Sequence, residues 1–284
     1  MLTLNCHGKL IEFTQPIVMG ILNVTPDSFF PDSRKESTEA IRSRVCQIKS
    51  EGGLIIDVGA YSSRPGAEDV SPEEEMSRLR KALPIIKEVA PELLVSVDTF
   101  RADVSKMCVE EYGVDIINDI SAGQLDREMY RTVARLRVPY ILTHLNGTPH
   151  TMQDNPQYAH FLPEVFSYFA QHIQRLRELG LSDIILDPGF GFGKLLEQNY
   201  ELLAHLSDFR EFNLPLLVGI SRKSMIYKLL DTTPNEALNG TSVLHAICLM
   251  EGADILRAHD VREAVETIKL YSSYIKHKET DVQL

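Results

Sequence analysis

The 284-residue sequence has few cysteines and no recognisable export signal. Its four cysteines, at positions 6, 46, 108 and 248, are scattered, and no two form a Cys-x-x-Cys pair. His7 and His144 have no companions at metal-ligand spacing, so the sequence indicates no zinc site and we expect both histidines to be structural. The N-terminus lacks the basic-then-apolar pattern of a signal peptide. We therefore expect free thiols and a cytoplasmic location.

Basic residues are outnumbered, since 29 Lys and Arg stand against 40 Asp and Glu and give a net charge of −11. This balance favours solubility and argues against nucleic acid or an anionic membrane as a partner. No apolar run approaches the roughly 20 residues that a bilayer span needs, and no low-complexity segment or linker divides the chain. With 44% hydrophobic residues, residues 1–284 are expected to form one domain with a sizeable core. Because the net charge is negative, any anionic ligand would need a local cluster of cations.

Short apolar runs rich in β-branched residues recur along the whole chain, with helix-like stretches between them. The runs have the length of strands buried on both faces. They cover residues 17–22, 54–58, 93–97, 114–117, 140–142, 184–186, 216–218 and 255–256. Eight such units with right-handed crossovers favour an α/β fold of the (β/α)8 TIM barrel type over residues 16–277. Residues 1–15 are expected to form a short β-hairpin that turns at Gly8 and covers the bottom of the barrel.

Polar residues lie at or just past the ends of these runs, where the side chains of a parallel barrel converge on one mouth. They are Asp57, Asp98, Asn118, Asp187, Ser221, Arg257 and His259. Taken one at a time, each Asp or Asn would more often cap a helix or fix a turn. Their recurrence at strand ends predicts one active site.

The acidic and amide groups in this set suit a flat, nitrogen-rich ring. Asp98, Asn118 and Asp187 follow the third, fourth and sixth expected strands. A carboxylate accepts two parallel hydrogen bonds from an amidine-like edge, and an amide supplies one donor and one acceptor to neighbouring nitrogens. An aminopyrimidinone ring offers such an edge, and we expect it as the ligand.

The cations follow the last two strands, where barrels often bind phosphate. Residues 221–223 read Ser-Arg-Lys, and residues 257–259 read Arg-Ala-His. With the positive end of the next helix, they would hold a polyanion; the alternative is a helix-start serine beside solvated surface cations. Asn23 at the end of the first strand would add an oxygen ligand for magnesium, or would merely fix a turn.

Two loops, residues 25–29 and 62–66, follow the first two strands and are expected to overhang the mouth as lids. Arg64 in the second loop would meet a carboxylate of a second substrate, or only an exposed Glu. Residues 187–194 read Asp-Pro-Gly-Phe-Gly-Phe-Gly-Lys. Their glycines are weak evidence for a phosphate cradle, whereas Pro188 and the two phenylalanines suit a wall that stacks on a ring.

Several long motifs, in this order along the chain, resemble those of dihydropteroate synthases, the sulfonamide-target enzymes of folate synthesis. Residues 19–29 read Met-Gly-Ile-Leu-Asn-Val-Thr-Pro-Asp-Ser-Phe. The other motifs are residues 56–59, 63–67, 96–99, 117–119, 186–194, 219–223 and 256–261. The resemblance runs from about Pro16 to the final helix.

The resemblance implies a transferase that joins 6-hydroxymethyl-7,8-dihydropterin diphosphate to para-aminobenzoate, giving dihydropteroate and diphosphate. It implies a pterin site of Asp98, Asn118, Asp187, Phe192, Lys223 and Arg257. It implies a para-aminobenzoate site of Ser63, Arg64, Pro65, Lys223 and Ser221. It implies a diphosphate site of Asn23, Ser63, Arg64, Arg257 and His259, with Asn23 also binding Mg2+. The implied catalytic groups are Asp98, Asp187, Lys223, Asn23 and Arg257, with Asp57 orienting its neighbours. It also implies a homodimer.

The second loop departs from the family pattern. The usual Gly-Glu-Ser-Thr-Arg-Pro reads here Ala-Tyr-Ser-Ser-Arg-Pro, so Tyr61 replaces a Glu and Ser63 replaces a Thr. Ser63 keeps a hydroxyl but lacks a methyl group, and we expect it to alter para-aminobenzoate packing and sulfonamide sensitivity. A non-catalytic pterin-binding homologue remains one alternative. A corrinoid-type methyltransferase is another, although it would need neither the residues at 63–65 nor the anion site at 257 and 259.

Overall fold

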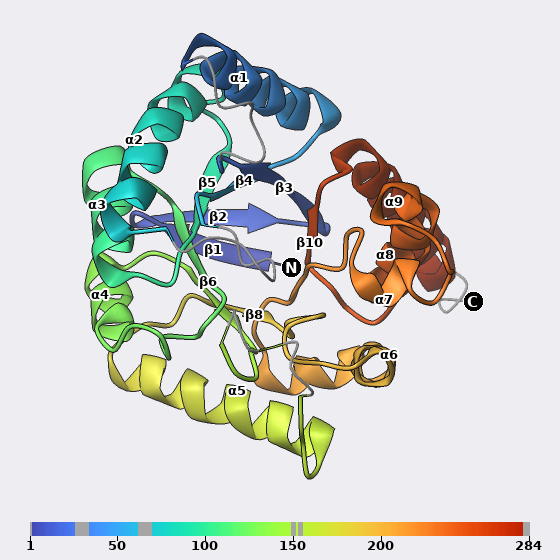
Figure 1. Ribbon diagram of the computed structural model, residues 1–284. Helices are drawn as coiled ribbons and strands as arrows, with labels where there is room; N and C mark the ends of the chain where they lie inside the picture. The colour runs from blue at the N-terminus through green and yellow to red at the C-terminus, as the bar shows by residue number, and fades with distance from the viewer. Residues whose placement is uncertain (1, 26–33, 62–69, 149–151, 153–155, 281–284) are drawn as a thin grey trace.

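A closed sheet of eight parallel strands forms the centre of the computed structural model, which describes residues 2–25, 34–61, 70–148, 152 and 156–280 (Figure 1). The strands are β3 (Ile17–Asn23), β4 (Ile55–Gly59), β5 (Leu94–Asp98), β6 (Ile116–Asp119), β7 (Tyr140–Thr143), β8 (Ile184–Asp187), β9 (Leu217–Val218) and β10 (Ile255–Ala258). They pair in the order β8-β7-β6-β5-β4-β3-β10-β9, and a parallel bridge from Leu186 to Leu216 joins the two ends. The predicted (β/α)8 barrel is confirmed, and every strand lies within two residues of its predicted bounds.

Helices surround the barrel (Figure 1). They are α1 (Arg34–Glu51), α2 (Pro72–Val89), α3 (Ala102–Tyr112), α4 (Met129–Leu136), α5 (Phe161–Glu178), α6 (Leu196–Ala204), α7 (Ser224–Tyr227), α8 (Leu238–Met250) and α9 (Val261–Thr280), with 3-10 helices η2 (Leu206–Phe212) and η3 (Pro234–Glu236). Helix α2 illustrates the local logic: the Ser71 hydroxyl caps it by accepting from the Glu74 amide at 3.2 Å, and Leu79 and Leu83 are buried on its inner face. None of the helices in the described ranges is long and apolar enough to cross a membrane.

The strand side chains alternate between two apolar layers. Val18 and Ile56 point outward and pack with the helices in the larger core cluster, whereas Met19 and Ile55 belong to a separate cluster inside the barrel. This alternation is the period-two geometry of a strand buried on both faces. It explains why the strands appear in the sequence as continuous apolar runs.

A β-hairpin closes the N-terminal end of the barrel, as predicted. Strands β1 (Leu2–Cys6) and β2 (Lys9–Phe13) pair antiparallel, and the turn between them places His7 and Gly8 at φ values of 54° and 79°, as a tight hairpin turn requires. Leu4 is buried and packs with the cluster inside the barrel. The hairpin therefore covers the bottom of the barrel.

Toward the opposite end the barrel interior becomes polar. Asn23 pairs in register with Gly59, Gly59 with Asp98, and Asp98 with Asn118, so these four residues form one row across four neighbouring strands. The row lies at the carboxyl ends of the strands. The mouth predicted from strand-end residues is therefore a single polar surface.

Candidate active site

Asp57 is the centre of a buried hydrogen-bond network inside the barrel. Its side chain is fully buried, and Oδ1 accepts from the Ser96 hydroxyl at 2.7 Å. Its Oδ2 accepts from Nδ2 of Asn118 at 3.1 Å and from Nε of Arg257 at 2.6 Å. Asp57 thus fixes the orientation of two predicted pterin-binding side chains from below, in agreement with the role that the sequence suggested.

Arg257 bridges two carboxylates. Besides Asp57, its Nη2 donates to Oδ2 of Asp98 at 3.0 Å. Burial raises the pKa of Asp98 to about 7, although the charge of Arg257 opposes the shift. Burial disfavours the charged form of Arg257 and would lower its pKa. The negative charges of Asp57 and Asp98 have the larger effect and raise the pKa of Arg257 above its ordinary value. The site therefore contains a permanent cation beside a carboxyl group that titrates near neutral pH.

Asn23 and Asp98 face a shared space above Gly59. A Cβ atom at position 59 would lie 3.4 Å from Oδ1 of Asn23 and 3.9 Å from Oδ2 of Asp98. Glycine at this position leaves the space between the amide and the carboxylate open. In the described residues no group of three or more His, Cys, Asp or Glu side chains could hold a metal ion. Asn23 would therefore be one oxygen ligand of a magnesium ion whose other ligands include water or substrate oxygens.

A second cation lies on the other side of the mouth. Burial lowers the pKa of Lys223 to about 8, with the charge of Asp187 opposing the shift. Its Nζ donates to the carbonyl of Phe190 and lies 4.2 Å from the centre of the Phe192 ring. Burial raises the pKa of Asp187, whose Oδ1 accepts from the Gly189 amide at 2.8 Å. Asp187, Phe192 and Lys223 are thus brought together, as the sequence predicted.

Lys194 holds the Gly-rich loop in place, a role that the sequence analysis missed. Its buried Nζ donates to the carbonyls of Gly189 at 2.8 Å and Phe192 at 3.1 Å, and lies 2.8 Å from Nδ1 of His144. Burial lowers the pKa values of Lys194 and His144 well below their ordinary values. His144 thus contacts the lysine that holds this loop. The sequence signal for this role is the position of Lys194 at the end of the Gly-rich loop.

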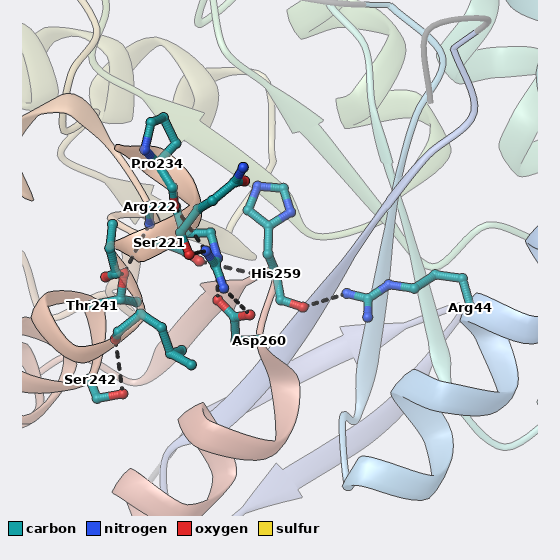
Figure 2. A network of polar contacts seen from close by, with 11 residues as sticks. Arg44, Ser221, Arg222, Pro234, Thr241, Ser242, His259 and Asp260 are labelled. Atoms are coloured by element: carbon teal, nitrogen blue, oxygen red, sulfur yellow. Dashed lines mark hydrogen bonds and ion pairs between the residues drawn. The ribbon is translucent and has the colours of Figure 1, made fainter. Parts of the chain in front are cut away.

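The ends of β3 and β10 are fastened from outside the barrel by Arg44 of α1 (Figure 2). Its Nε donates to the carbonyl of Ile21 at 3.1 Å, and its Nη2 donates to the carbonyl of His259 at 2.7 Å. The amide of His259 donates to the Ser221 hydroxyl at 3.2 Å. Ser221 and His259, which the sequence predicts together in a polyanion site and the resemblance assigns to different ligands, are therefore neighbours.

Arg222 does not belong to the mouth. Its Nε and Nη2 donate to both oxygens of Asp260, at 2.8 and 2.9 Å (Figure 2), and its Nη1 donates to the carbonyls of Pro234 and Asn235. The sequence predicts Arg222 among the cations of a polyanion site, or as a solvated surface charge. The structure instead uses it to tie the chain after β9 to the start of α9. Among the predicted cations that the structure describes, Lys223 and Arg257 are directed to the mouth.

The predicted residues Ser63, Arg64 and Pro65 lie outside the described residues, as does most of the first loop. Thr25, which begins that loop, is buried. The second loop is bounded by the described residues Tyr61 and Val70.

The fold and the site together define a class: a TIM-barrel protein whose mouth combines a row of carboxyl and amide groups with two cations and an aromatic wall. Such a mouth can bind a planar, nitrogen-rich ring next to an anion.

Comparison with known proteins identifies the family. The family described as pterin binding enzyme matches residues 19–259. The dihydropteroate synthase of Escherichia coli is 42% identical over 282 residues, covering 96% of each chain. The solved dihydropteroate synthase of Yersinia pestis, in complex with a sulfonamide drug, has a TM-score of 0.87 at 37% identity and covers 97% of this chain and 100% of its own. That of Xanthomonas albilineans with 4-aminobenzoic acid has a TM-score of 0.86 at 35% identity, covering 96% and 97%. The chain belongs to the dihydropteroate synthase family of pterin-binding enzymes.

Proposed function

We propose that the chain condenses 6-hydroxymethyl-7,8-dihydropterin diphosphate with para-aminobenzoate, as a transferase of folate biosynthesis. The observation that carries this function is the convergence of Asp98, Asn118 and Asp187 on one mouth with the cations Lys223 and Arg257. The extensive similarity to dihydropteroate synthases supports it.

The pterin is held by its hydrogen-bonding edge. Carboxylates of Asp98 and Asp187 accept from ring and amino nitrogens, and Asn118, fixed by Asp57, supplies a donor and an acceptor. Phe192 provides a flat surface next to the charge of Lys223.

The diphosphate lies against the cationic side of the mouth, where Arg257 offers a fork of donors that suits phosphate oxygens. His259 adjoins this side, because Arg44 fixes its carbonyl and Ser221 accepts from its amide. Asn23 would supply a protein oxygen to Mg2+, which usually takes few protein ligands and completes its shell with phosphate and water. The bound ion would help to neutralise the diphosphate as it leaves.

The chemistry is a loose substitution at the pterin methylene group. The bond from carbon to the diphosphate oxygen breaks as the electron-rich dihydropterin stabilises positive charge on that carbon. In this proposal the negative charges of Asp98 and Asp187 stabilise the cation, while Arg257, which is paired with Asp98, stabilises the departing diphosphate. The amine of para-aminobenzoate is neutral near pH 7, so its lone pair forms the new C–N bond, and the resulting ammonium releases one proton to water or to the departing diphosphate without a strong general base.

Para-aminobenzoate binds on the side of Lys223 and Ser221, and the second loop supplies Ser63, Arg64 and Pro65. The ammonium of Lys223 and the guanidinium of Arg64 are suited to the carboxylate of this substrate.

The test is diphosphate release from the purified protein, supplied with the pterin diphosphate and Mg2+, in the presence and absence of para-aminobenzoate. We expect amine-dependent release and a product with the mass of dihydropteroate. Pterin binding without turnover would overturn the proposal and identify a non-catalytic homologue.

We also propose a cytoplasmic homodimer. Val243 of α8, and Leu270 and Tyr274 of α9, are apolar side chains between 52% and 75% exposed, and these two helices pack side by side (Figure 1). A second copy covering them would remove this apolar surface from water. Light scattering gives the mass of the particle in solution; a monomer at micromolar concentration would contradict the dimer.

The cysteines in the described residues are free, in keeping with a reducing compartment.

A further inference from the structure

Arg222 lies in a turn between two predicted site residues, Ser221 and Lys223. The amide of Lys223 donates to the carbonyl of Ile220 at 3.0 Å, so residues 220–223 form a β-turn. Arg222 occupies the third position of this turn with a φ value of 54°, a left-handed conformation for which glycine is the usual residue. A residue with a Cβ atom keeps such a conformation only where its surroundings hold it. The turn therefore depends on the contacts of Arg222.

The side chain and the amide of Arg222 contact three separate segments of the chain (Figure 2). Nε and Nη2 donate to both carboxylate oxygens of Asp260, at 2.8 and 2.9 Å. Nη1 donates to the carbonyls of Pro234 at 2.8 Å and Asn235 at 2.7 Å, and the backbone amide donates to Oγ1 of Thr241 at 3.0 Å. A forked pair with a carboxylate fixes direction as well as distance. These contacts, the Arg222 clamp, join the turn to η3, to α8 and to the residue before α9.

The sheet itself gives the turn little support. Strand β9 has only two residues, and its ladder with β10 ends at Val218. Beyond that point the carboxylate of Asp260 pairs with Arg222. One residue earlier in each segment, the amide of His259 donates to the Ser221 hydroxyl at 3.2 Å. These contacts take over from the ladder in fastening together the segments that follow β9 and β10.

Lys223 leaves the turn toward the mouth. Its Nζ donates to the carbonyl of Phe190 and lies 4.2 Å from the centre of the Phe192 ring, whereas the guanidinium of Arg222 pairs with Asp260 outside the mouth. Neighbouring side chains point in different directions because the backbone turns between them. A rotation of this turn would therefore move the ammonium of Lys223 relative to the aromatic wall.

We propose that Arg222 is a positioning residue for the ligand site: its clamp on the turn holds the ammonium of Lys223 against the Gly-rich loop. Arg222 acts through Lys223 and contacts no ligand itself. The identity of the ligands, the pterin diphosphate and para-aminobenzoate, rests on the proposed function. Loss of the clamp should weaken binding only where Lys223 is present to be misplaced.

The first measurement is deuterium uptake by peptides covering residues 219–227, read by mass spectrometry. The amides of Arg222 and Lys223 are both hydrogen-bonded, so their exchange reports on the turn without any ligand. Arg222→Met removes the side-chain contacts of the clamp, and Asp260→Asn weakens the forked pair while keeping the size of the side chain. We expect faster uptake in both variants. Arg262→Met is the matched control on the first turn of α9, since its side chain is 66% exposed, and it should resemble the parent.

The second measurement separates positioning from a merely structural role. Calorimetry gives Kd for the pterin diphosphate in Arg222→Met, in Lys223→Met and in the double variant. We expect Arg222→Met to raise Kd about tenfold in the parent background and by less than about twofold in the Lys223→Met background, since residues that act through one another are not additive. Urea unfolding should show the same loss of stability in both backgrounds. Arg222→Lys keeps a charge beside Asp260 and should recover part of the affinity.

Equal changes of Kd in the two backgrounds would overturn the inference, because Arg222 would then act on the fold and not through Lys223. Unchanged uptake in both Arg222→Met and Asp260→Asn would overturn it as well. If Arg222→Met does not fold, Asp260→Asn replaces it in both measurements and decides the matter. A parent protein that binds no pterin diphosphate would defeat the proposed function, whereas the uptake measurement would still test the clamp.

Discussion

Nε of Arg257 donates a 2.6 Å hydrogen bond to Oδ2 of Asp57, a residue 200 positions earlier in the chain. The two residues lie on β10 and β4, which flank β3 on either side. The bond therefore crosses the barrel interior past an intervening strand. Because Asp57 also accepts from Ser96 and Asn118, one carboxylate connects four strands beneath the mouth.

Asp57→Asn should be more damaging than its small change in shape suggests. It removes the charge of a fully buried carboxylate that is one of the two partners of Arg257, and we expect the free energy of unfolding to fall by about 3 kcal/mol and turnover to fall sharply as Asn118 and Arg257 lose their orientation. Urea unfolding and steady-state kinetics measure both effects. Ser96→Ala, which removes one hydrogen bond to the same carboxylate, should cost only about 1 kcal/mol; equal losses in the two variants would contradict this account of Asp57.

The pH dependence of kcat/KM for the pterin diphosphate should have two limbs. Since the pKa of Asp98 is raised to about 7, its carboxylate form grows as pH rises through neutrality, and kcat/KM should rise with it. Since the pKa of Lys223 is lowered to about 8, its positive charge is lost above that pH, and kcat/KM should fall. Lys223→Arg keeps the charge at all accessible pH values. Its ratio to the parent cancels substrate ionisation and should increase above pH 8; a constant ratio would argue against Lys223.

Arg44→Met should loosen the mouth from outside. The change leaves the carbonyls of Ile21 and His259 without their shared donor, and we expect a loss of about 2 kcal/mol of stability together with a higher KM for the pterin diphosphate. Arg42→Met on the same helix removes only an exposed pair with Glu88 and should have little effect. Thermal unfolding and kinetics of the two variants provide the comparison, and an unchanged KM in Arg44→Met would remove Arg44 from the site's support.

Lys194→Met should weaken pterin binding by about tenfold or more, because the carbonyls of Gly189 and Phe192 lose a buried donor and Phe192 loses its fixed position. Calorimetric titration with the pterin diphosphate is the direct measurement. The exposed Lys81→Met is the control for loss of charge. Full pterin affinity in Lys194→Met would show that the loop holds its shape without the ammonium group.

Leu4→Ala should separate stability from catalysis. Leu4 is 1% exposed and packs inside the bottom of the barrel, so the cavity should lower the unfolding free energy by about 3 kcal/mol. The kcat value should stay the same, because the hairpin lies at the end opposite the mouth. Leu10→Ala in the same hairpin alters a side chain that is 61% exposed and should be neutral for both; a lower kcat in Leu4→Ala would contradict the separation.

The sequence was sufficient for the architecture because each strand is buried on both faces. Runs such as 184–186 and 216–218 have no polar interruption, and the number and spacing of the eight runs favoured a closed barrel. The parallel arrangement of these strands also predicted that polar residues at their carboxyl ends meet at one mouth. Asp98, Asn118 and Arg257 were expected at one mouth, and the register and hydrogen bonds bring them together there.

The supporting interactions were beyond the sequence because they join segments that are far apart. Nothing in the composition of α1 shows that Arg44 reaches the carbonyl of His259, 215 residues later. Arg222 looked like a phosphate ligand from its neighbours, yet pairing with Asp260 in the folded chain uses its guanidinium. Local sequence patterns predict which strand or helix carries a side chain. Its hydrogen-bond partner, in contrast, depends on which distant segments the closed barrel brings next to it.

The position of the β1–β2 hairpin also determines through which end the protein can be attached to a support. It caps the barrel at the end remote from the mouth, and the chain's N-terminal label lies within the outline of the barrel in the axial view (Figure 1). A linker joined to β1 would therefore extend away from the mouth. Molecules immobilised on a sensor surface through that end would present their open side to the flowing solution, so that pterin and aryl-amine binding could be followed without obstruction by the support.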